Sequence, residues 1–292
     1  MPLSRRGFVA LAGASALAAA MPCGAARPAA PADRLVSIGG VVTEILFALG
    51  AGDRIVAVDS TSSYPPEADA LPDVGYIRQL VAEPIIALEP SLVLMLDGAG
   101  PPTTVEQLQA AKVPIRTVPD DPTALGIAEK IRIVGDAVGL GPEGRALADR
   151  VDGELARLAG EISAVEERPS VLFVLAASNG RLLAAGDGTS AAGIIELAGG
   201  RNAVVGFEDY RPLSAEAAVA AEPDLLLFMD RTLDEMGGMA GVLARPELAL
   251  TPAAQAGRVK AMDGLLLLGF GPRTPQAVRE LAAAIHPGLA LP

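Results

Sequence analysis

The side chains best suited to chemistry are a tyrosine and an arginine two positions apart, Tyr76 and Arg78, in the segment that begins at Gly75. The positive charge of a guanidinium stabilises a neighbouring phenolate and reduces the cost of removing its proton. A phenolate oxygen is a hard ligand, which suits a hard metal ion. If the segment is extended, both side chains point to the same side of the chain. The pair therefore predicts an anionic oxygen ligand with a supporting cation.

The other ring side chains have weaker signals. Tyr64 lies in a Ser-Thr-rich loop before two prolines, where it either lines the same site as Tyr76 or is an exposed turn residue. Tyr210 is expected to pack or to line a cleft rather than to act as a ligand. Phe270 is expected in the core, and His286, at the end of the last predicted helix, is expected at the surface.

Two arginines are further candidates for binding an anionic group. Arg231 follows a predicted strand at residues 225–229, which is the usual place for a ligand residue in an open α/β sheet. A solvated surface arginine explains it equally well. Arg273 follows a Gly-Phe-Gly-Pro sequence and is either a ligand contact or the first residue of a helix.

Composition limits the classes of function. The 292 residues are 51% hydrophobic, enough for one large domain or two of ordinary size. The net charge of −12 argues against binding to nucleic acid. One cysteine and one histidine exclude a disulfide framework, a cysteine-rich metal cluster, a multi-histidine zinc site and, by motif, a Ser-His-Asp hydrolase. No nucleophile–base pair and no glycine-rich phosphate loop is recognisable.

Residues 1–32 have the features of an export signal. Arg5 and Arg6 precede Gly-Phe and an apolar run at residues 9–21, which predicts a twin-arginine signal; an ordinary secretory signal is the alternative. The run is shorter than the ~20 residues needed to span a bilayer. Cleavage is expected after Ala26 or Ala32. Lipid anchoring through Cys23 is not expected, because a proline precedes it.

Alternating apolar runs and helical patterns predict an α/β fold. Strands are expected at residues 35–38, 55–58, 92–96 and 115–118, with helices at 42–49 and 103–111. After a long helical stretch the pattern restarts, with strands at 171–175 and 225–229 and helices at 190–198 and 274–285. This order indicates parallel sheets covered on both faces.

The helical stretch at residues 125–165 separates the two halves. It is broken at 139–142, and beyond the break an apolar stripe follows one face of a helix about 35 Å long. Each half also contains a helix that ends near Glu-Pro, at Glu89 and Glu222, directly before a buried strand. We therefore expect two Rossmann-like lobes, 33–141 and 168–292, joined by a bridging helix at 142–167.

Several segments resemble a known family. The opening sequence, Arg34-Leu-Val-Ser-Ile-Gly-Gly and Thr43-Glu-Ile-Leu-Phe-Ala-Leu-Gly, resembles class III periplasmic binding proteins. Narrower matches resemble the haemin-binding branch of that class. They are Leu71-Pro-Asp-Val-Gly-Tyr-Ile-Arg-Gln-Leu, Ala99-Gly-Pro-Pro, Gly199-Gly-Arg-Asn-Ala-Val, Tyr210-Arg-Pro-Leu-Ser-Ala-Glu and Met262-Asp-Gly-Leu-Leu-Leu-Leu-Gly-Phe-Gly-Pro-Arg-Thr. Together they cover nearly the whole chain after the signal.

The resemblance implies a periplasmic, non-enzymatic carrier that captures haem b between its lobes. It places the iron-binding tyrosine on Tyr76 and its hydrogen-bonding arginine on Arg78. Tyr64, Arg231 and Arg273 are further candidates for contacts with the haem, from their positions in the sequence. Some family members bind a second haem through a histidine after the first strand of the second lobe. Residues 176–180 contain no histidine here, so one haem is expected.

The resemblance also implies partners. Class III proteins deliver their ligand to an inner-membrane permease with its ATPase, and dock through one acidic residue on each lobe. Glu106 and Glu235, or its neighbour Asp234, are the candidates. An outer-membrane haem receptor upstream and a monomeric state are expected.

Other functions remain open. A cobalamin or ferric-siderophore carrier of the same class is the nearest alternative, although such sites usually rely on tryptophan and this chain has none. A periplasmic metal-cofactor enzyme is a third possibility. A structural or sensory domain would leave Tyr76 and Arg78 without a purpose.

Overall fold

The computed structural model describes residues 34–176, 181–289 and 291. The chain divides into residues 1–30 and 31–292, and only the second unit is described below. The predicted export signal, with Cys23 and both cleavage sites, lies outside the described residues. Within the described residues, no helix is both long enough and apolar enough to cross a bilayer.

The first half of the fold is a four-stranded parallel sheet in the order β2-β1-β3-β4. Its strands are β1 (Leu35–Ile38), β2 (Ile55–Val58), β3 (Leu92–Leu96) and β4 (Ile115–Val118), as predicted from the apolar runs. The helices are α1 (Gly40–Ala48), α2 (Ala82–Ala87) and α3 (Pro102–Ala110). Alternate strand residues belong to different apolar clusters, so the sheet is covered on both faces.

The second sheet has the order β10-β9-β5-β6-β8, with the short β7 (Arg201–Asn202) beside β5. Strands β5 (Ser170–Ala176), β9 (Leu225–Met229) and β10 (Val259–Met262) are parallel. Strands β6 (Leu182–Ala185) and β8 (Tyr210–Pro212) are antiparallel, so the prediction of a purely parallel sheet is wrong for this lobe. The connection between β5 and β6, residues 177–181, is too short for a parallel crossover, whereas β8 follows β6 after a longer segment that contains α6.

Helices cover this sheet on both sides. They are α6 (Ser190–Leu197), α7 (Ala215–Ala220), α8 (Asp230–Glu235), α9 (Gly238–Ala244), α10 (Pro252–Gln255), α11 (Gly264–Leu268) and α12 (Thr274–Ile285). Of the predicted helices, 274–285 matches α12 at both ends. Glu89 and Glu222, in the two Glu-Pro sequences, both have positive φ, 47° and 42°, so the two halves repeat the same helix-to-strand turn.

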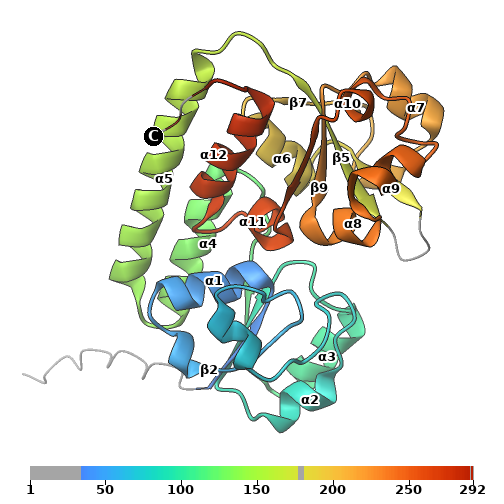
Figure 1. Ribbon diagram of the computed structural model, residues 1–292. Coiled ribbons are helices and arrows are strands. Elements are labelled where there is room, and N and C mark those ends of the chain that lie inside the picture. The colour runs from blue at the N-terminus through green and yellow to red at the C-terminus, as the bar shows by residue number, and fades with distance from the viewer. Residues whose placement is uncertain (1–33, 177–180, 290, 292) are drawn as a thin grey trace, which may run out of the picture. The chain divides into compact units, whose positions relative to one another are not determined.

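Helices α4 (Ala124–Ala137) and α5 (Gly141–Ser163) separate the two sheets along the chain and lie side by side (Figure 1). The predicted break falls at Gly139, whose φ of 77° suits glycine. A Cβ on Gly135 would lie 2.9 Å from the Gly144 Cα, so the close approach of the helices needs glycine there. The predicted stripe of α5 is buried from Leu147 to Ile162.

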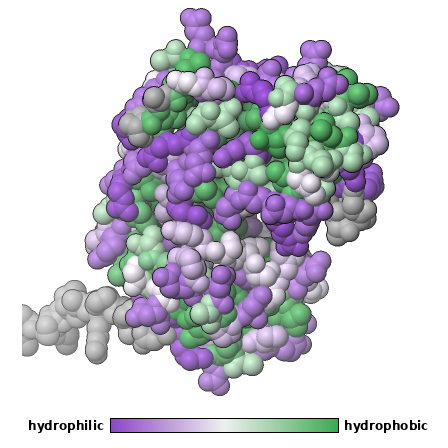
Figure 2. Space-filling view, viewed as in Figure 1, coloured by the Kyte–Doolittle hydropathy of each residue, from purple (hydrophilic) through white to green (hydrophobic). Residues whose placement is uncertain are grey.

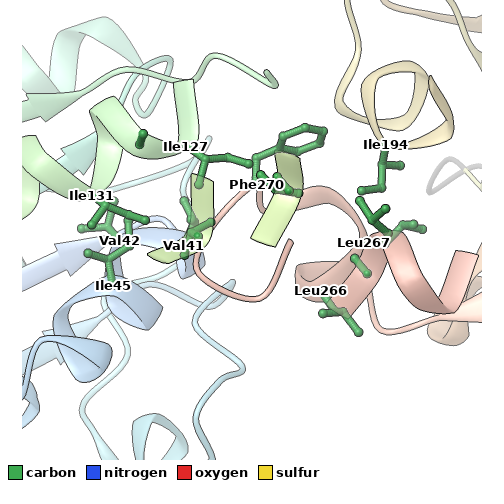
Figure 3. Packing of buried hydrophobic residues seen from close by; sticks show 14 of the residues in the cluster. Val41, Val42, Ile45, Ile127, Ile131, Ile194, Leu266, Leu267 and Phe270 are labelled. Carbon is green, nitrogen blue, oxygen red and sulfur yellow. The ribbon is translucent and has the colours of Figure 1, made fainter. Parts of the chain in front are cut away.

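One apolar cluster continues from the first lobe into the second. It includes Val42 and Ile45 of α1, Ile131 of α4 and Leu267 of α11, with Phe270 beside them (Figure 3). The joint between the lobes is therefore itself a packed core.

Helix α4 has partners in both lobes. It packs against α1 of the first lobe, and the Lys130 Nζ donates to the Gly269 carbonyl of the second at 3.4 Å. The domain boundaries at residues 141 and 167 stay a prediction.

Candidate functional site

Tyr76 lies on a loop that crosses the carboxyl edge of the first sheet. The loop begins beside β2, where the Val74 amide donates to the Val58 carbonyl at 2.9 Å and the Ser60 amide donates to the Gly75 carbonyl at 3.0 Å. It ends beyond β3, where the Gly100 amide donates to the Ile77 carbonyl at 2.9 Å. In open α/β sheets this edge is where ligands bind.

The segment around Tyr76 is a turn rather than an extended strand, because the Gln79 amide donates to the Tyr76 carbonyl at 2.7 Å. Ile77, at the middle of the turn, is buried and anchors it. Tyr76 is 48% exposed, and Arg78 is exposed as well. The backbone thus keeps the phenol open to an approaching ligand.

Arg78 is held by the loop that follows β3. Its Nη1 donates to the Gly98 carbonyl at 3.0 Å. Gly98 has a φ of 74°, and a Cβ there would lie 2.9 Å from the same Nη1. Glycine at position 98 therefore leaves the space that the guanidinium fills.

Tyr64, the second candidate on this edge, is 38% exposed and stacks with an arginine of the other lobe. The Arg273 Cζ lies 3.5 Å from the centroid of the Tyr64 ring. On its other side Arg273 contacts Glu44 of α1: its backbone amide and its Nε each donate to that carboxylate at 3.0 Å, and its Nη2 lies 2.9 Å from Oε2. A contact of Arg273 with a ligand stays a prediction.

Glu44 is almost fully buried, with 4% of its surface exposed. Burial raises the pKa of its carboxyl, and the hydrogen bonds and charge of Arg273 act against that rise. The arginine at the start of α12 is thus the partner that compensates a buried carboxylate on α1.

A buried polar network that the sequence reasoning missed supports this edge. The Asp59 carboxylate accepts from the Gly39 amide at 2.7 Å, from the Thr61 amide at 3.0 Å and hydroxyl at 2.7 Å, and from the Ser62 hydroxyl at 3.1 Å. Gly39 is the N-cap of α1, where the helix dipole favours negative charge. The signal for this network in the sequence was Asp59, which directly follows β2, together with the Gly39-Gly40 pair, which directly follows the neighbouring strand β1.

The remaining predicted residues lie apart from this group. Arg231, on α8, pairs with Glu235 one turn further on, with 2.7 Å between Nε and Oε1, and this hydrogen bond raises the pKa of the guanidinium. Both side chains are exposed, and so are Asp234 and Glu106, which lies on α3. Nothing in the described contacts brings Arg231 to Tyr76, and its role in binding stays a prediction.

Three ring side chains have structural roles. Tyr210 packs edge-to-face on Phe173, 6.4 Å between centroids, and burial raises its pKa to about 12. Phe270 is in the core, as predicted. The prediction that His286 lies at the surface is wrong: it is 8% exposed, and its Nε2 is 3.2 Å from the Gly199 carbonyl oxygen, because the chain folds back after α12 onto the end of α6.

The hollows of the surface do not all belong to this site. One cavity of about 660 Å³ lies at the amino ends of β5 and β9, opposite the carboxyl edge of the second sheet, and is lined in part by Arg168, Asp224, Arg258 and His286. In the space-filling view the outline is indented where the part carrying α8 faces the part carrying α2 and α3 (Figure 2).

Comparisons with known proteins agree on the class of protein. A family model described as periplasmic binding protein matches residues 35–265. The periplasmic haem-binding protein RhuT from Roseiflexus sp. RS-1, solved in apo form, is 41% identical with a TM-score of 0.85, and the match covers 89% of this chain and all of that one. The periplasmic haem-binding protein BhuT, solved in complex with two haems, is 40% identical with a TM-score of 0.82, over 88% of this chain and 99% of that one.

Two further relatives are similar in sequence, and one of them is named for another ligand. An ABC transporter substrate-binding lipoprotein of Bacillus subtilis, YvrC, is 27% identical over 87% of this chain and 80% of its own length. The vitamin B12-binding protein of Yersinia pestis is 39% identical over 88 residues, which are 30% of this chain and 31% of that protein. The match to the vitamin B12-binding protein is therefore limited to about a third of each chain.

Proposed function

We propose that this chain, which belongs to the periplasmic binding protein family, binds haem between its two lobes and delivers it to an ABC importer. The observation that carries the proposal is the exposed Tyr76 phenol on the carboxyl edge of the first sheet, with Arg78 fixed nearby by Gly98. A ferric ion prefers a hard oxygen ligand, and the phenolate of Tyr76 supplies one. The likeness to two haem-binding structures over most of the chain supports haem as the ligand.

The ligand assignment is tested by titrating the mature protein with haemin and following the Soret band. Wild type is expected to show a saturable shift with the spectrum of a tyrosinate-ligated ferric haem. Tyr76→Phe is expected to lose that spectrum, and Tyr64→Phe, which keeps the stacked ring, is expected to retain it. A wild type without a saturable shift would refute haem binding, and an unchanged spectrum for Tyr76→Phe would refute the ligand.

We propose one haem per protein. Tyr76 is the iron ligand expected from the sequence, and residues 176–180, most of which lie outside the described part of the chain, contain no histidine. The same titration should show its break at one equivalent of haemin. A break at two equivalents would place this protein with its relative that holds two haems.

Delivery to a permease is supported by exposed carboxylates on both lobes. Glu106 lies on α3 of the first lobe and Glu235 on α8 of the second. In vesicles that contain the permease and ATPase, Glu106→Lys and Glu235→Lys are each expected to reduce the stimulation of ATP hydrolysis. The control is Glu143→Lys, an exposed change on α5. Equal stimulation by all three variants would refute these docking positions.

The export signal and the family support a periplasmic location, and the proline before Cys23 supports a protein without a lipid anchor. A cobalamin carrier is the second candidate, favoured by the shorter match to the vitamin B12-binding protein. Competition of cobalamin with haemin in the titration distinguishes the two ligands. Displacement of haem by stoichiometric cobalamin would favour this second candidate.

A further inference from the structure

We propose that Arg273 is a positioning residue, which reaches from the second lobe to hold the Tyr64 ring at the edge of the Tyr76 site, and that Glu44 fixes Arg273 in turn. Its effect on affinity rests on the proposed haem binding. Its structural part, the placement of the Tyr64 ring, does not depend on a ligand.

Arg273 cannot move independently of α1. Its backbone amide, its Nε and its Nη2 all lie within 3.0 Å of the Glu44 carboxylate, and only 18% of its side chain is exposed. A guanidinium that binds one carboxylate through several atoms has one favoured orientation. Glu44 therefore determines which way the flat face of Arg273 points.

Glycines on both sides of this pair let the two segments pack closely. A Cβ on Gly271 would lie 2.7 Å from the Val41 Cγ2, and a Cβ on Gly40 would lie 3.0 Å from a methyl carbon of Leu265. The segment before α12 thus packs directly on the start of α1. Glu44 and Arg273 are 229 residues apart in sequence, and their ion pair joins the two lobes.

The face of Arg273 is occupied by Tyr64, with 3.5 Å from Cζ to the ring centroid. Tyr64 belongs to the same loop as Ser60, whose amide binds the Gly75 carbonyl beside Tyr76. One face of the Tyr64 ring is thus covered, while 38% of the residue stays exposed. A ring that is already fixed loses less conformational freedom when a flat apolar ligand packs on it.

The arrangement also bears on Arg273, which the sequence leaves as either a ligand contact or the first residue of a helix. The Arg273 Nε and Nη2 face Glu44 and its Cζ lies over the Tyr64 ring, so Nη1 is the one guanidinium nitrogen outside these contacts. Moving the guanidinium toward a haem propionate would weaken its contacts with the buried carboxylate. Arg273 acts on the ligand through Tyr64 instead.

The first test needs no ligand. The chain has three tyrosines, so protein labelled with 3-fluorotyrosine gives three ¹⁹F resonances, assigned by Tyr→Phe substitution. Arg273→Lys and Glu44→Gln are each expected to shift the Tyr64 resonance. The Tyr210 resonance should stay in place, because its ring is packed on Phe173, and it reports that the fold is intact. The control is Arg145→Lys, a surface pair with Asp136. An unmoved Tyr64 resonance in both variants overturns the proposal.

The second test uses haemin affinity. Loss of the stacked guanidinium in Arg273→Lys, or of the ring in Tyr64→Leu, is expected to weaken haemin binding by about 2- to 30-fold. The double variant should bind no more weakly than Tyr64→Leu alone, because both substitutions remove the same contact. Additive losses would mean that Arg273 contacts the ligand itself and would overturn the proposal. If wild type fails to bind haem, the haem function fails, while the ¹⁹F result still decides the placement of Tyr64.

Discussion

Replacing Gly98 by alanine should weaken haem binding by moving Arg78. Gly98 has a φ of 74°, which costs a residue with a side chain ~1–2 kcal/mol of stability. The new Cβ would also lie 2.9 Å from the Arg78 Nη1. The far end of an exposed side chain moves away cheaply, so the clash adds little to the cost of folding. It does break the hydrogen bond from Arg78 to the Gly98 carbonyl and displaces the guanidinium.

The chain offers a matched control. Gly50 has a φ of 75°, and a Cβ there would meet nothing within 4 Å. Gly98→Ala and Gly50→Ala should therefore lose similar stability in urea unfolding. Only Gly98→Ala should lose haem affinity, by ~1–2 kcal/mol for one charge-assisted interaction at an exposed site, or about 5- to 30-fold. Equal haemin affinity in the two variants would refute the view that the held position of Arg78 supports the Tyr76 phenolate.

Three further predictions concern buried charges. Burial raises the folded-state pKa of Glu44, so its contribution to stability is present below about pH 4.5 and is lost as pH rises through the folded pKa. In denaturant titrations, the free energy of unfolding of wild type minus that of Glu44→Gln should therefore fall as pH rises over that window. A rise would contradict the prediction. Lys130 is fully buried, 3.5 Å from an Asp120 oxygen, and burial lowers its pKa. The Asp120 side chain is 35% exposed and stays solvated without the lysine, so Lys130→Met should be no less stable than wild type at pH 7, and any advantage should shrink as pH approaches 10.5. A loss of more than about 1 kcal/mol in thermal or urea unfolding would show that the Lys130–Asp120 pair is net stabilising. Asp59→Asn keeps the size of the side chain but turns one hydrogen-bond acceptor into a donor, and should cost about 2–4 kcal/mol of stability in urea unfolding. A cost below about 1 kcal/mol would show that the Asp59 network contributes little to stability.

The sequence alone was sufficient for the α/β class, for the first sheet and for the helices that separate the lobes. Strands β1 to β3 are apolar runs of four or five residues that are mostly buried, so composition is a direct signal for them, whereas the edge strand β4 has two exposed residues, Arg116 and Thr117. The break at Gly139 and the stripe of α5 are local patterns as well. Strands β6, β8 and β10 were missed because they have only three or four residues each, and pairing with distant segments makes them strands: β6 pairs with β5, β8 with β6 and β10 with β9.

The candidate site divides in the same way. Tyr76 and Arg78 were predicted from their types and spacing, but their surroundings were not: the turn that exposes them depends on amides at Ser60 and Gly100, and Arg78 is held by Gly98. Tertiary structure alone decided that Arg273 joins Glu44 and Tyr64, and that His286 is buried. The type of a side chain and its local spacing indicate which chemistry it can perform. Its partner is decided by which distant segments pack together, and that depends on the burial of the whole core.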